Sequence, residues 1–170
     1  MRGRPERSEA AAHYFTYIDQ VEGTDPLAVL AEQLEELPGL CATIAEEKSL
    51  YRYGPDKWSI RQLLNHVTDT ERAFAFRALW FARGFVEALP GYDQNIAVAG
   101  AEADRVCWSA HVEEFRAVRL STMLLFASLP AAAWMRTGIA SENPFTVRSL
   151  AYIIAGHAAH HVRILRERYL

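Results

Sequence analysis

The chain has 170 residues, of which 51% are hydrophobic and 23% are charged, which suits one globular domain with a sizeable core. Its net charge of −3 and scattered arginines argue against a nucleic-acid-binding protein. No signal-peptide pattern follows the basic start and no run approaches the roughly 18 apolar residues of a membrane span, so we expect a cytoplasmic protein without membrane contact.

Polar and charged residues dominate positions 1–12, which we interpret as a flexible N-terminal arm. The next segment, Tyr14–Ile18, is aromatic and is expected to pack onto the rest of the molecule. The length and apolar content of the chain are those of one ordinary globular domain. We therefore expect residues 13–170 to form a single domain.

Two long helices are predicted in the first half of the chain. Asp25 as N-cap and Pro26 at the first helical position begin one, and Pro38 is expected to kink or end it. Ser59 and Gln62 form the capping-box pattern that begins the other, which should run to about residue 82. Residues 85–103 are then expected to form a long connection of the kind that is often functional.

Two further long helices are predicted in the second half. Apolar residues at helical spacing indicate a helix over about 104–129, and a loop should follow. Thr146 as N-cap begins a last helix that continues to the C-terminus. Because no segment shows β-strand alternation, the pattern predicts an all-α four-helix bundle, a fold that builds metal sites between facing helices.

A histidine pair stands on the last helix. His157 and His161 are four residues apart, so one helical face presents both imidazoles to a single ion. The pair shares its helical phase with apolar residues, namely Leu150, Ile154 and Leu165. That phase places the two histidines on the face directed towards the core.

A third candidate ligand, His66, lies on a plausible inward stripe of the second long helix. Three imidazoles leave at least one coordination position of a divalent metal open, as in catalytic zinc sites. A core histidine that bonds a neighbouring group is the alternative for His66. The sequence thus predicts a metal site between two helices.

Other side chains are weaker candidates for the same site. Arg61 and Arg163 are candidates for orienting an anionic cofactor or substrate, against the alternative of surface ion pairs. His160 lies next to the histidine pair without an assigned role. Tyr92 and Asp93 in the long connection are expected to approach the open metal position, since loops often carry substrate contacts.

Two segments carry a family resemblance. Lys57–His66 with the following Thr-Asp-Thr-Glu motif, and Tyr152–Arg163 with its Gly-His-Ala-Ala-His-His core, resemble the DinB-like family of damage-inducible, YfiT-like metalloproteins. The resemblance implies a four-helix bundle, often a homodimer. It also implies zinc or nickel bound by histidines at the positions of His66, His157 and His161.

Members of the wider family look like transferases and isomerases that use a low-molecular-weight thiol. Together with the residues, the resemblance favours a metal-dependent enzyme that activates a thiol or a water, as an S-transferase, isomerase or hydrolase acting on a small-molecule substrate. A non-catalytic metal-binding protein of the stress response is the alternative. Which metal is bound is left open, because imidazole suits several transition metals.

Overall fold

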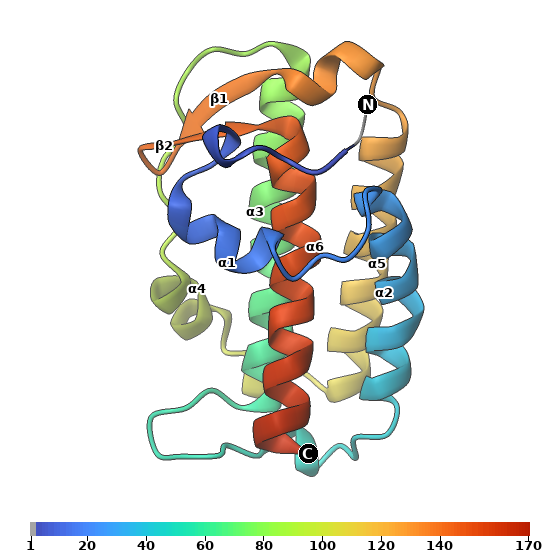
Figure 1. Ribbon diagram of the computed structural model, residues 1–170. Helices are drawn as coiled ribbons and strands as arrows, with labels where there is room; N and C mark the ends of the chain where they lie inside the picture. The colour runs from blue at the N-terminus through green and yellow to red at the C-terminus, as the bar shows by residue number, and fades with distance from the viewer. Residues whose placement is uncertain (1–2) are drawn as a thin grey trace.

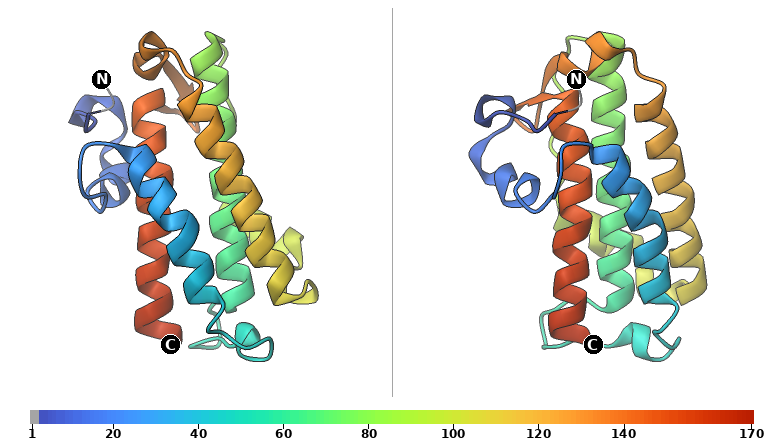
Figure 2. Two further views of the ribbon diagram at one scale, coloured as in Figure 1. Left: turned by 90° about the vertical axis from the view of Figure 1, so that its right-hand side faces the viewer. Right: turned by 45° about the vertical axis from the view of Figure 1, so that its right-hand side comes forward.

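The computed structural model describes residues 3–170 and contains four long helices that lie side by side. These helices are α2 (Pro26–Cys41), α3 (Ile60–Arg83), α5 (Trp108–Ala127) and α6 (Val147–Ile164). Helices α3 and α2 each pack against both α5 and α6, which closes the bundle (Figures 1 and 2). The predicted four-helix bundle is confirmed.

Helices α2 and α3 begin at the caps that the sequence predicted, whereas α5 begins at Trp108, four residues later than predicted. The carboxylate of Asp25 accepts a hydrogen bond from the amide of Leu27 at the start of α2. At the start of α3, Ser59 and Gln62 each accept from the other's backbone amide. Gly84 ends α3 in the left-handed conformation, with φ of 89°. These starts and stops depend only on neighbouring residues, which is why the sequence reveals them.

Pro38, which was expected to kink or end α2, lies inside this helix, which continues to Cys41. Two connections contain elements that the sequence did not predict. The long connection contains helix α4 (Gln94–Ala101). The loop before α6 contains an antiparallel hairpin, β1 (Thr137–Ala140) and β2 (Asn143–Thr146), in which Thr137 pairs with Thr146. Shorter elements are α1 (Phe15–Ile18), the 3₁₀ turns Arg7–Glu9, Ala12–Tyr14, Lys48–Leu50, Ala103–Arg105 and Ala131–Met135, and the π-helical turn Leu165–Tyr169.

A buried polar network ties the four long helices together. The guanidinium of Arg119 on α5 donates to the carboxylate of Glu71 on α3 at 2.8 and 2.9 Å. It also donates to Gln33 on α2 at 2.7 Å, and the amide of Gln33 donates to the carbonyl of Ala155 on α6 at 2.8 Å. Arg119 and Glu71 are 0% and 2% exposed. Each group thus finds a partner without water, as buried polar groups require.

The predicted N-terminal arm lies against the start of α6. The carboxylate of Glu9 forms an ion pair with Arg148 and accepts a hydrogen bond of 2.7 Å from the hydroxyl of Thr146. Ala10 forms an isolated bridge with Phe145 of β2. Residues 1 and 2 of the predicted arm lie outside the described residues. The flexibility of the arm stays a prediction.

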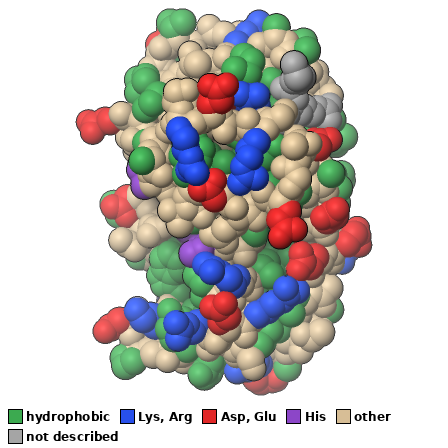
Figure 3. All heavy atoms as spheres, in the orientation of Figure 1, with side chains coloured by type: hydrophobic (Ala, Val, Ile, Leu, Met, Phe, Trp, Pro, Cys, Tyr) green, Lys and Arg blue, Asp and Glu red, His purple; other side chains and the backbone are tan. Residues whose placement is uncertain are grey.

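The surface mixes both signs of charge. Figure 3 shows Lys and Arg side chains interspersed with Asp and Glu on the face that carries α1 and α6. Within residues 3–170, none of the helices is long and apolar enough to cross a membrane.

Candidate metal centre

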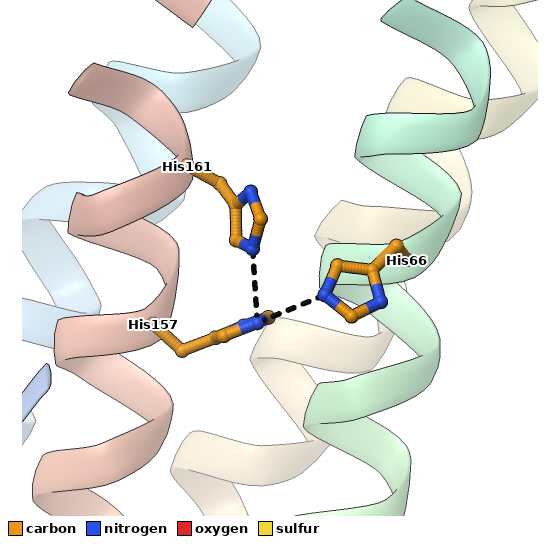
Figure 4. Close-up of side chains that lie close together, drawn as sticks. All are labelled: His66, His157 and His161. Carbon is orange, nitrogen blue, oxygen red and sulfur yellow. Dashed lines mark hydrogen bonds between the residues drawn. The ribbon is translucent and has the colours of Figure 1, made fainter. Parts of the chain in front are cut away.

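Helices α3 and α6 bring the three predicted histidines together. Nε2 of His157 lies 3.0 Å from Nε2 of His66 and 3.1 Å from Nε2 of His161 (Figure 4). The three ring nitrogens therefore converge from two helices on one small volume. Among the described residues, this cluster of potential ligands contains no Cys, Asp or Glu.

Helix phase accounts for the convergence. His157 and His161 are one turn apart on α6 and point towards α3, as the shared stripe with buried Leu150, Ile154 and Leu165 requires. His66 leaves α3 on its own buried stripe, near Leu63 and Thr70. Because α3 and α6 are direct neighbours in the bundle, these two stripes face each other.

Burial keeps the histidines neutral. His66 and His157 are only 2% and 6% exposed. Burial lowers the pKa of His66 to about 4 and that of His161 to about 3. Burial, and then the nearby His161 and His66, lower the pKa of His157 well below its ordinary value. At neutral pH each imidazole therefore keeps a free lone pair, which metal coordination requires.

The geometry of the cluster fits a divalent metal. Bonds of about 2.1 Å in a tetrahedral site place imidazole nitrogens about 3.4 Å apart, close to the separations found here. Without an ion, each neutral imidazole has a single N–H, so Nε2 of His157 cannot satisfy both neighbours. An ion in the centre would accept all three lone pairs.

Helix α3 also supplies a partner for the outer side of one ring. The hydroxyl of Thr70 lies 3.3 Å from Nδ1 of His66, which fixes the ring so that Nε2 faces the cluster. Asp69, three residues after His66, forms an ion pair with Arg72 at 3.0 Å. Nδ1 of His161 is buried and has no hydrogen-bond partner among residues 3–170.

A cavity of about 160 Å³ opens beside the histidines. It lies between α1, α3, α6 and the segment that leads into α4. The predicted Tyr92 lines it, whereas Asp93 caps α4 through the amides of Asn95 and Ile96. The lining residues are Tyr14, Tyr17, His66, Thr70, Ala73, Phe74, Arg77, Tyr92, Gln94, Ser141 and His157.

A second cavity, of about 300 Å³, lies on the side of His161. Consecutive residues at the start of α4 line different cavities, Gln94 the first and Asn95 the second. Trp58, which also lines the second cavity, places its ring 4.8 Å from that of His66. The histidine cluster thus lines two cavities, the first through His66 and His157 and the second through His161.

The short helix α1 covers the cluster on a third side. The ring of Tyr17 packs edge-on against His157 and His160, with ring centroids 5.3 and 5.4 Å apart. Gly156 permits this approach, because a Cβ atom at that position would overlap the carbonyl group of Tyr17. Sequence reasoning missed this contact, although a glycine directly before a histidine within a predicted helix was an available signal.

The predicted arginines lie elsewhere. Arg61 donates to Ser49, to the carbonyls of Asp104 and Val106 and to Glu46, and it lines neither cavity beside the histidines. Arg163 lies on the outer side of α6, with Nη2 3.5 Å from Nδ1 of His160. The arginine that does line the first cavity is Arg77, which sequence reasoning missed. Its position eleven residues after His66 places both on one helical face.

Known proteins support the same fold. The family model described as the DinB superfamily matches residues 30–165. Among solved structures, YfiT from Bacillus subtilis, described as a probable metal-dependent hydrolase with an unusual four-helix bundle topology, superposes with a TM-score of 0.70. The match covers 96% of this chain and 89% of that chain at 16% sequence identity. No curated protein sequence matches significantly.

Proposed function

Because the chain belongs to the DinB superfamily and brings three imidazoles to one point, we propose that it is a metal-dependent enzyme acting on a small-molecule substrate. In this proposal His66, His157 and His161 bind a divalent transition metal. Zinc and nickel are the preferred ions, since both accept imidazole ligands.

One observation carries the proposal of catalysis: the three-histidine cluster borders a cavity. Structural zinc sites are closed by four protein ligands, whereas catalytic sites keep one position for water or substrate. Here only three potential ligands converge within residues 3–170, and two of them, His66 and His157, line the cavity of about 160 Å³. This arrangement favours an enzyme over a protein that stores or senses the ion.

His66, His157 and His161 would hold a divalent ion, which would supply Lewis acidity for activating a water and polarising a substrate carbonyl. Around it, the residues of this chain position the substrate. Burial raises the pKa of Tyr17 and Tyr92 above the ordinary value, so both hydroxyls stay protonated at neutral pH and can donate hydrogen bonds to a substrate oxygen. Phe74 and Tyr14 supply the apolar wall.

Hydrolysis is the reaction that we favour. YfiT, whose fold this chain shares, is described as a probable metal-dependent hydrolase, which supports this choice. The second candidate is a thiol-dependent transfer in which a low-molecular-weight thiol takes the position of the water. The second cavity, next to His161, offers space for such a cofactor.

We also propose a homodimer. Phe76 and Leu79 on α3 are 51% and 36% exposed and line a groove whose other wall, on α5, includes Val118 and Leu125. A second copy of the chain would remove this apolar surface from water. Light scattering on the purified protein tests this point, and Phe76→Glu should then yield monomers.

The test of the proposed function uses protein purified without an affinity tag and analysed for bound metal. Small esters, amides and phosphoesters are screened for turnover, with and without a low-molecular-weight thiol. We expect turnover that is lost in His66→Ala and kept in His13→Ala, which alters an exposed histidine outside the cluster. Turnover that survives His66→Ala would sink the proposed mechanism, and turnover only with thiol would select the second candidate.

A further inference from the structure

Three arginines are buried within residues 3–170, and one of them lacks an acidic partner. Arg61 pairs with Glu46, and Arg119 pairs with Glu71. Arg77 is 5% exposed and forms no ion pair with any described residue. Burying a charge without a counter-charge costs free energy of folding, so the position of Arg77 needs an explanation.

Arg77 instead meets neutral groups. Its Nη2 donates to the hydroxyl of Ser141 at 2.8 Å and to the carbonyl of Pro90 at 3.5 Å, and Tyr14 lines the same cavity. Its guanidinium carbon lies 4.9 Å from the ring centre of Phe74. Burial lowers the pKa of Arg77. The guanidinium nonetheless remains charged, because its pKa lies far above neutral pH.

The position of Arg77 relates it to the metal centre. Eleven residues of α-helix make about three turns and a rise of about 16.5 Å, so Arg77 and His66 lie on one face of α3. Helical side chains tilt towards the N-terminus, which directs Arg77 back towards His66. Both residues line the cavity of about 160 Å³, with Thr70, Ala73 and Phe74 between them. His66, His157 and the unpaired Arg77 thus line the same cavity.

We propose that Arg77 binds the carboxylate of the substrate, so that the enzyme acts on small carboxylic acids with an apolar or aromatic body. The planar guanidinium matches a carboxylate in a two-bond geometry, and the hydroxyls of Ser141 and Tyr14 supply further donors. One guanidinium and two hydroxyls suit a carboxylate better than a phosphate dianion, which has more oxygens to satisfy. Phe74 and Tyr92 then contact the apolar body of the substrate.

This inference rests on the proposed function only in that the same cavity holds the substrate. Its test needs no turnover. Calorimetry compares the binding of 3-phenylpropanoate with that of its neutral analogue 3-phenylpropanamide, for the protein as purified and after treatment with a chelator. We expect the carboxylate to bind about 10-fold more tightly or better in both preparations.

Substitutions test whether Arg77 causes the preference for the carboxylate. Arg77→Met should abolish the preference for the carboxylate, and Arg77→Lys, which keeps the charge but loses the planar fork, should reduce it. Arg83→Met, an exposed arginine of the same helix, should behave like the wild type. If Arg77→Met does not fold, Arg77→Lys decides the question.

Three results would overturn the inference. The first is equal binding of the two probes, or no binding of the carboxylate at millimolar concentration. The second is a preference that Arg77→Met, or Arg77→Lys where the first variant does not fold, leaves unchanged. The third is a preference that disappears with the chelator, since the carboxylate would then bind the metal. A protein that binds no metal but keeps the preference would contradict the proposed function and leave this inference standing.

Discussion

The carbonyl group of Tyr17 lies where a side chain at Gly156 would have to be. This close approach of α1 to α6 places the ring of Tyr17 against His157. A residue without a side chain therefore determines how the candidate metal centre is covered.

Replacement of this glycine tests the contact. In an exposed helix, Gly→Ala stabilises by up to about 1 kcal/mol. For Gly156→Ala we expect the opposite, a loss of about 1–3 kcal/mol, because α1 must move. Urea unfolding measures the change, and Gly100→Ala in α4, where a Cβ atom meets open space, is the matched control that should not destabilise. A Gly156→Ala protein as stable as the wild type would contradict the packing described.

Metal removal should lower thermal stability. An ion that binds only the native state at 100 times its dissociation constant stabilises by about 2.7 kcal/mol, or roughly 5–10 °C for a domain of this size. We expect a chelator to reverse such a shift in the wild type and to have no effect in His157→Ala. Circular dichroism of His157→Ala should remain helical. Collapse of that variant would instead indicate that the ion has a structural role.

The buried pair of Arg119 and Glu71 predicts a large effect from one substitution. Arg119→Met leaves the carboxylate of Glu71 buried without its counter-charge, and we expect a loss of about 3–5 kcal/mol in the free energy of unfolding. Arg72→Met removes a half-exposed arginine that pairs with Glu114, and should cost about 1 kcal/mol or less. Similar costs for the two variants would show that the buried network contributes little.

Acid should loosen the N-terminal arm. Burial raises the pKa of Glu9, but hydrogen bonds from Arg148, the amide of Glu6 and Thr146 outweigh it and bring the pKa below 4.5. Because the native pKa is the lower one, this contribution to stability is present above about pH 4.5 and is lost as the pH falls through the native value. Thermal melts from pH 6 to 3 should show a steeper decline for the wild type than for Glu9→Gln. Parallel curves would rule out this role for Glu9.

The sequence predicted those features that depend on neighbouring residues. Helix starts at Asp25, Ser59 and Thr146 are confirmed, because each cap bonds amides within three residues. The hairpin was missed because its turn residues, Ser141 and Glu142, adopt positive φ angles of 50° and 62° without the glycine or asparagine that normally marks such a turn.

In the candidate site, too, the sequence predicted what depends on local spacing and missed what depends on tertiary contacts. The four-residue spacing of His157 and His161 identified them as candidate ligands. The structure places His66 beside them. The role of all three as metal ligands stays a proposal. Arg77 was not predicted, because its importance depends on missing acidic neighbours and on a cavity shared with the start of α4 and with Ser141. Such tertiary relationships leave no local signal in the sequence.

Helix α4 contributes to both cavities beside the histidines. Its first two residues, Gln94 and Asn95, face different cavities, and Asp93 holds that end of the helix through two amides. The first turn of this short helix therefore belongs to the walls of both cavities.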